Sequence, residues 1–151
     1  LVNGSGLFDG NLIAATHITH VLRYMYLSPA HRSEYLSMLA VGGDEGTLHS
    51  RLRNLPAPRI VRAKTGTLND VSGLSGVITR EDGVPQLAFS ILTNARDVGS
   101  MAAPIRRQFE DRIVMALLWA LDDYEAQRTG LTDGRPRAPS RGAARAAPAR
   151  P

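Results

Sequence analysis

The chain has 151 residues, a formal net charge of +4 and no cysteine. This length fits one domain with a single core, and the lack of cysteine excludes disulfides, thiolate metal sites and a cysteine nucleophile. No apolar run approaches the ~20 residues of a membrane span, so we expect no transmembrane segment. Residues 128–151 hold six Arg and one Asp, a net charge of +5, which leaves residues 1–127 at −1. The folded part is therefore nearly neutral, and we expect no nucleic-acid partner.

Hydrophobic spacing predicts helices in the first third of the chain. Apolar residues recur at helical intervals over 14–27 and again over 32–40, and 46–52 is compatible with a short third helix. Residues 1–11 are rich in Gly, Asn and Asp, which predicts a loop. The prolines within 54–58 predict an extended connection.

The middle of the chain has the pattern of strands. We predict strands at 60–65, 71–80 and 86–93, with a hairpin turn at 81–83 between the last two. In the third strand both faces carry apolar residues, so we expect both faces of the sheet to be covered.

The last predicted element is a helix that begins near Pro104 and lies across the sheet. Its apolar residues recur every three or four positions, and we expect them to face the strands: Ile105, Phe109, Ile113, Leu117, Leu121 and Tyr124, with Ala116 and Ala120 between them. Beyond residue 127 the sequence is mostly Arg, Ala, Pro and Gly, so 128–151 is expected to be a disordered tail. The predicted fold class is α/β (α+β), with antiparallel strands packed by a C-terminal helix.

Lys64 is the single lysine among 18 basic residues. A lysine ammonium is a compact charge that shifts its pKa and moves protons, whereas a guanidinium is a permanently charged planar fork. Lys64 precedes Thr65 and Gly66, and Lys-Thr-Gly is one of three elements of penicillin-recognising serine enzymes, beside Ser-x-x-Lys and Ser-x-Asn. On a strand beside a cleft, Gly66 would let an extended peptide approach the backbone closely and pair with it as an added strand. Lys64 and Thr65 could then bind the carboxylate of that peptide. For the lysine count alone, a surface lysine left by chance is an equal alternative.

The segments around this motif resemble the C-terminal part of the class C low-molecular-mass penicillin-binding proteins, the D-alanyl-D-alanine carboxypeptidase/endopeptidase family. The resemblance spans roughly residues 1–125 and departs from the family pattern at Asn3, Phe8 and Glu45. It rests on these segments, in order: Asn3-Gly4-Ser5-Gly6-Leu7, Asn11-Leu12, Leu39-Ala40-Val41-Gly42-Gly43, Gly46-Thr47-Leu48, 61–68 and 71–76.

The resemblance implies that residues 1–127 are the C-terminal part of a carboxypeptidase (transpeptidase-like) domain of the penicillin-recognising serine enzyme fold. Its partners would be D-Ala-D-Ala peptides of peptidoglycan and β-lactams, in an extracytoplasmic compartment, without a cofactor or metal. It gives Lys64 a catalytic role and assigns Thr65, Gly66 and Thr67 to substrate binding. Neither Ser-x-x-Lys nor Ser-x-Asn occurs in this sequence, and in the family both lie upstream, together with any signal peptide. We therefore expect the chain alone to be inactive.

Two other functions use the same triplet. The chain could be a non-catalytic module that holds a D-Ala terminus or anchors to the envelope through its basic tail, or it could be part of a serine β-lactamase. His17 and His20 lie three apart on a predicted helix, a spacing that can hold zinc, but the sequence offers no third ligand near them. A zinc site is therefore disfavoured.

Overall fold

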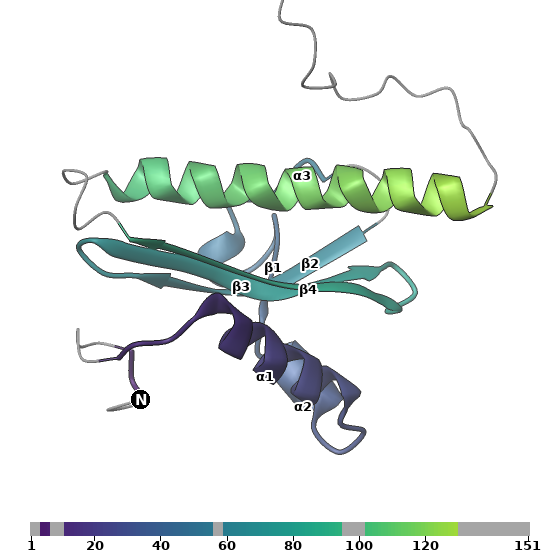
Figure 1. Cartoon of the computed structure of the whole chain (residues 1–151), viewed down its shortest axis with the longest axis horizontal. Coiled ribbons are helices and arrows are strands. Elements are labelled where there is room, and N and C mark those ends of the chain that lie inside the picture. The colour runs from purple at the N-terminus through teal and green to yellow at the C-terminus, as the bar shows by residue number, and fades with distance from the viewer. Residues whose placement is uncertain (1–3, 7–10, 56–58, 95–101, 130–151) are drawn as a thin grey trace, which may run out of the picture.

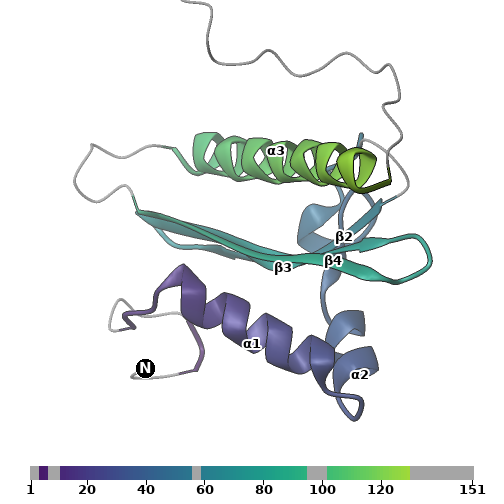
Figure 2. The same cartoon turned by 45° about the vertical axis from the view of Figure 1, so that its right-hand side comes forward.

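The computed structural model describes residues 4–6, 11–55, 59–94 and 102–129, which form a sheet between two helical layers (Figure 1). The elements in chain order are α1 (Ala15–Leu27), α2 (Arg32–Ser37), β1 (Ala40–Val41), the 3-10 turn η1 (Gly46–Leu48), β2 (Arg59–Thr67), β3 (Val71–Arg80), β4 (Pro85–Asn94) and α3 (Ala103–Thr129). The strands form one antiparallel sheet in the order β1-β2-β3-β4. Helix α3 covers one face, and α1 and α2 cover the other (Figure 2). The predicted fold class is confirmed.

All three predicted strands are confirmed, and β3 has the predicted bounds. Strand β2 begins one residue earlier and ends two residues later than predicted, and β4 is one residue longer at each end. The β3–β4 hairpin closes where the Gly83 amide donates to the Arg80 carbonyl at 3.0 Å. Gly83 has a φ of 80°, a left-handed conformation that glycine adopts without steric cost.

The region between α1 and β2 differs from the sequence-based expectation. The helix predicted over 32–40 ends at Ser37, because Ala40 and Val41 pair with Ala63 and Arg62 of β2. The short helix predicted over 46–52 is a single 3-10 turn of three residues. Long-range pairing with β2 outweighs the local helical spacing here.

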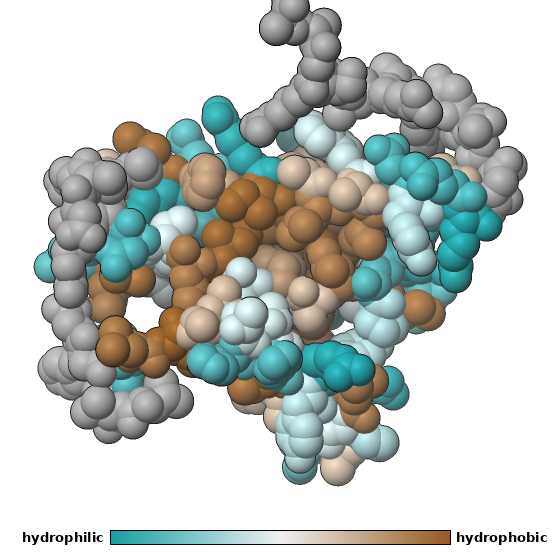
Figure 3. All heavy atoms as spheres, viewed as in Figure 1, coloured by the Kyte–Doolittle hydropathy of each residue, from teal (hydrophilic) through white to brown (hydrophobic). Residues whose placement is uncertain are grey.

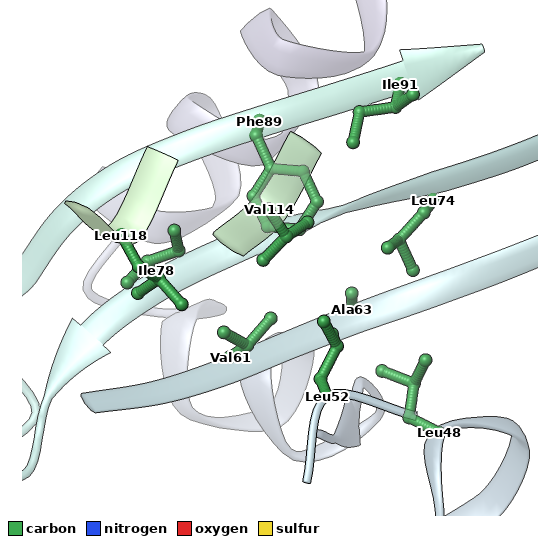
Figure 4. Packing of buried hydrophobic residues seen from close by; sticks show 10 residues of the cluster. All are labelled: Leu48, Leu52, Val61, Ala63, Leu74, Ile78, Phe89, Ile91, Val114 and Leu118. Atoms are coloured by element: carbon green, nitrogen blue, oxygen red, sulfur yellow. The ribbon is translucent and has the colours of Figure 1, made fainter. Parts of the chain in front are cut away.

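The larger core lies between the sheet and α3 (Figure 4). Val61 and Ala63 of β2 meet Leu74 and Ile78 of β3 on this face, and all four are fully buried. The remaining members of this cluster are Leu48, Leu52, Phe89, Ile91, Val114 and Leu118. A smaller cluster on the opposite face joins Leu22 of α1 to Leu39 and Val77. The sheet is therefore covered on both faces, as the sequence predicts.

The final helix lies across the sheet as expected, but the predicted buried face is wrong. The fully or nearly buried positions are Arg106, Glu110, Val114 and Leu118, one residue further along than the predicted stripe. One residue corresponds to a rotation of roughly 100° about the helix axis. Of the predicted residues, Ile113, Leu117 and Leu121 only flank the core. Ala116 and Ala120 are exposed.

The rotation leaves large apolar side chains of α3 exposed. Ile105 and Phe109 are each 53% exposed, Trp119 is 51% exposed and Tyr124 is 63% exposed. In the space-filling view, hydrophobic residues gather over the middle of the molecule between α3 and the sheet (Figure 3). The helix continues to Thr129, so the prediction of a disordered tail from residue 128 is wrong for 128 and 129, and the rest of that tail lies outside the described residues.

Candidate functional site

The Lys-Thr-Gly motif lies at the end of β2, where one edge of the strand is open. Strand β1 pairs with β2 only at Arg62 and Ala63. Within the described part of the chain, no strand pairs with residues 64–67 on that side. On their other side the same residues pair with 72–75 of β3. Residues 64–67 of β2 therefore form an open edge of the sheet.

The direction of the backbone groups along β2 follows from one hydrogen bond. The Gly42 amide donates to the Val61 carbonyl at 2.8 Å, so the polar groups of Val61 point toward the β1 side. Backbone groups of alternate residues in an antiparallel strand point to the same side. The amides and carbonyls of Thr65 and Thr67 therefore point out of the open edge, while those of Lys64 and Gly66 point toward β3.

The side chains of the motif lie on both faces of the sheet. Val61 and Ala63 are buried under α3, and by strand alternation Thr65 and Thr67 follow on that face. Lys64 and Gly66 lie on the opposite face, with α1 and α2. The Lys64 ammonium nevertheless donates to the Thr65 carbonyl at 2.6 Å. The exposed ammonium thus lies at the same open edge as the outward backbone groups.

A second hydroxyl reaches the edge from η1. Thr65 Oγ1 donates to Thr47 Oγ1 at 2.9 Å. Leu48, next to Thr47, is fully buried in the α3-side core and fixes the turn. From the sequence alone, Thr47 belongs to the resemblance but not to the predicted site. Its position in Gly46-Thr47-Leu48 is the signal that could have found it.

Glycine at position 66 has no packing reason within the described structure. A Cβ built on Gly66 meets no atom within 4 Å. At Gly76, by contrast, a Cβ would overlap the Arg62 carbonyl oxygen and the Ala63 side chain. Gly76 is therefore required by the contact between β2 and β3, whereas Gly66 leaves open space above the strand end.

Buried charges of α3 hold the turn that follows the motif. Arg106 is 2% exposed, and its Nη2 donates to the carbonyls of Leu68 and Asn69 at 3.0 and 2.9 Å. The Leu68 amide donates to the Val71 carbonyl at 2.8 Å and closes the same turn. These bonds fix where β2 ends and therefore where Thr67 lies.

Glu110, which is fully buried, links α3 to β3 and to the segment after η1 beneath this turn. Ser72 of β3 donates to its Oε1 at 2.6 Å and shares a second hydrogen bond of 2.6 Å with Thr93 of β4. Arg51, which follows η1, pairs with its Oε2 at 2.9 Å and with Asp111 at 2.8 Å. Burial acts to lower the pKa of Arg51, but the hydrogen bonds and charges of Asp111 and Glu110 raise its pKa above the ordinary value.

The remaining sequence candidates form no comparable arrangement. His17 accepts a hydrogen bond from the Ala14 amide through Nδ1 at 3.3 Å, as part of the start of α1. In the described ranges, no three His, Cys, Asp or Glu side chains gather into a set that could hold a metal ion. No helix there combines the length and the apolar character needed to cross a membrane.

The edge of β2 therefore collects hydrogen-bond donors: an ammonium, two outward amides and the hydroxyls of Thr65 and Thr47. An ionised carboxylate only accepts hydrogen bonds, so this donor set is chemically matched to one. The D-Ala-D-Ala carboxypeptidase 3 (S13) family matches residues 1–116 of the chain. The chain belongs to this family.

Two similar proteins are named as carboxypeptidases. The S13 chain is 38% identical over 98 residues to a D-alanyl-D-alanine carboxypeptidase of an Actinomadura species, covering 62% of this chain and 18% of that protein. It is 38% identical over 100 residues to the penicillin-sensitive carboxypeptidase A of Dictyostelium discoideum, covering 62% and 19%. The chain thus spans about a fifth of the length of these relatives.

A solved structure agrees with the family assignment. Penicillin binding protein 4 of Haemophilus influenzae, in a complex with a β-lactam, superposes with a TM-score of 0.60 at 26% identity. The superposition covers 77% of this S13 chain and 28% of that structure. The family expected from the sequence is therefore confirmed, and the chain corresponds to a minor part of its members.

Proposed function

We propose that this chain is the C-terminal portion of a serine-type D-alanyl-D-alanine carboxypeptidase and that the open end of β2 binds peptidoglycan stem peptides. The observation that carries this proposal is the contact between the Lys64 ammonium and the Thr65 carbonyl at 2.6 Å. It brings a positive charge to the strand edge at which an extended peptide would pair. Membership in the S13 family supports the same substrate class.

The bound peptide adds a strand to the open edge. Its backbone pairs with the outward amides and carbonyls of Thr65 and Thr67. These hydrogen bonds contribute affinity that does not depend on the side chains of the peptide. Its terminal carboxylate lies near the Lys64 ammonium and the threonine hydroxyls. Gly66 leaves room above the strand for the D-Ala methyl groups and the reacting carbonyl. A β-lactam, which also carries a carboxylate, occupies the same edge.

In the family's mechanism, a serine attacks the carbonyl of the penultimate D-Ala and releases the terminal D-Ala, and water then hydrolyses the acyl-enzyme. Neither Ser-x-x-Lys nor Ser-x-Asn occurs among these 151 residues. The role of this chain is therefore to bind substrate, and Lys64 supplies positive potential and a hydrogen bond to the Ser-x-Asn hydroxyl. Because peptidoglycan lies outside the cytoplasm, the proposed site of action is extracytoplasmic.

A second candidate is a non-catalytic module that holds a D-Ala terminus without cleaving it. The donor set at the edge of β2 supports it, because holding a carboxylate requires no nucleophile. Both candidates place the ligand on the same edge of β2, so one binding experiment tests the shared claim, and covalent labelling separates the chemistry.

The binding experiment compares two ligands that differ only at the C-terminus. The chain is titrated with N-acetyl-D-Ala-D-Ala as the free acid and as the C-terminal amide, and the two dissociation constants are measured by NMR. A hydrogen bond to a charged group contributes about 1.5–3 kcal/mol. We expect the acid to bind at least about tenfold more tightly than the amide. Equal affinities, or no saturable binding of the acid, would contradict the proposal.

A further inference from the structure

Thr47 accepts the one hydrogen bond that the Thr65 side chain makes in the described structure, at 2.9 Å between the two Oγ1 atoms. The two residues are 18 positions apart in the sequence. Thr47 is exposed on η1, and Thr65 is half-buried at the strand edge. The pair lies on the α3 side of the open edge, close to the outward amide of Thr65.

The turn that carries Thr47 is held on both sides. The Leu48 amide donates to the Glu45 carbonyl at 3.0 Å, and the Gly43 amide donates to the Leu48 carbonyl at 3.0 Å. Gly46 has a φ of 51°, which favours glycine at the start of the turn. Thr47 therefore presents its hydroxyl to β2 from a fixed position.

Hydrogen-bond chemistry limits what this pair can do when a carboxylate binds. A hydroxyl has one proton to donate and accepts through its lone pairs. In the structure Thr65 donates to Thr47. To donate to a carboxylate instead, Thr65 must release this bond, and the released Thr47 hydroxyl can then rotate and donate to Thr65 Oγ1.

We propose that Thr47 is a positioning residue for carboxylate binding, which donates to Thr65 Oγ1 while Thr65 donates to the ligand carboxylate. This inference rests on the proposed function and deepens it. Consecutive hydrogen bonds polarise one another, so the donation from Thr47 strengthens the donation from Thr65. Thr47 also holds the Thr65 side chain in the rotamer that places its hydroxyl at the edge.

The test measures the ratio of the dissociation constants of the acid and amide forms of N-acetyl-D-Ala-D-Ala in hydroxyl variants of the full chain. Thr47→Val keeps the shape and removes the hydroxyl, and we expect the preference for the acid to fall about threefold to tenfold, as for one neutral hydrogen bond. Thr47→Ser restores the hydroxyl, and we expect it to keep the wild-type preference. Thr16→Val removes an exposed hydroxyl from α1 and should leave the preference unchanged.

A double-variant cycle separates positioning from general damage to the fold. In a Thr65→Val background, Thr47→Val should cause no further loss of acid preference, because the relay is already broken. Thr47→Ala is measured as well, because it also removes the hydroxyl but cannot introduce a steric clash of the valine side chain. An acid preference unchanged in both Thr47→Val and Thr47→Ala, with a wild-type preference present, would overturn this inference alone. A wild-type chain without acid preference would overturn the proposed function and this inference together.

Discussion

The Lys64 ammonium donates to the carbonyl oxygen of Thr65, although the two side chains leave β2 on opposite faces of the sheet. The long lysine side chain reaches around the strand and brings its charge to the open edge. A carboxylate that binds at this edge therefore competes with a neutral carbonyl for the ammonium. Both bonds have an ionised donor, but only the carboxylate carries an opposite charge, so Coulomb attraction favours the exchange.

Lys64→Met removes the charge and keeps most of the apolar stem. We expect the acid form of N-acetyl-D-Ala-D-Ala to bind about tenfold or more weakly, with little change for the amide. Lys64→Arg should restore only part of this affinity, because a guanidinium is a planar fork and not a compact charge. Arg62→Met is the control, since it removes a cation from the same face of β2 beside β1. Equal losses in Lys64→Met and Arg62→Met would indicate a non-specific charge effect.

Gly66→Ala separates function from stability. Its Cβ meets no atom within 4 Å, so we expect the free energy of unfolding to change by less than about 1 kcal/mol. The added methyl group occupies space above the strand end, and we expect weaker binding of the acid peptide. Gly76→Ala is the contrasting variant, because its Cβ would overlap the backbone of β2 and should destabilise the fold strongly. Thermal unfolding and the peptide titration measure both effects, and unchanged peptide affinity in Gly66→Ala would contradict the proposed close approach.

Arg51→Met tests the buried charges that connect η1 to α3. Removing the guanidinium leaves Glu110 buried without its cation, and we expect a loss of about 3–5 kcal/mol in the free energy of unfolding. Arg80→Met breaks the pair with Asp82, in which both side chains are about half exposed, and should change stability by about 1 kcal/mol or less. Chemical denaturation of the two variants measures the difference. Similar small losses in both variants would mean that the network beneath the turn contributes little.

Covalent labelling tests where the nucleophile lies. A fluorescent penicillin acylates an activated serine, and we expect no stable adduct when it is incubated with this 151-residue chain, because the sequence contains no Ser-x-x-Lys. A relative that contains the element serves as the positive control. A covalent adduct on a serine of this chain, located by mass spectrometry, would contradict the account.

The strands and the motif could be predicted from the sequence because their signals are local. The predicted turn at 81–83 separates the two runs that form β3 and β4, and the single lysine marks the end of β2. Strand β1 has only two residues and no periodicity of its own, so its partner in β2 determines it. The Thr47 and Thr65 contact likewise depends on how η1 lies against β2, which no local pattern specifies.

The buried face of α3 was mispredicted because charged residues occupy it. Arg106 and Glu110 are buried only because they find partners elsewhere in the chain, the Leu68 carbonyl and the Ser72 hydroxyl, each 38 residues away. Sequence periodicity counts Arg and Glu as polar and assigns them to solvent. The apolar stripe through Ile105 and Phe109 is instead exposed within the described structure.

The most direct test of the account is residue-resolved NMR of the ¹⁵N-labelled chain during titration with N-acetyl-D-Ala-D-Ala. If the peptide adds to the open end of β2, the largest saturable shifts will occur at the amides of Thr65 and Thr67, which point outward. The amides of Lys64 and Gly66 point toward β3 and should shift less. The largest shifts on β4, which is the other edge of the sheet, or no saturable shifts at all, would contradict the claim that this strand end binds the carboxyl terminus of a D-Ala peptide.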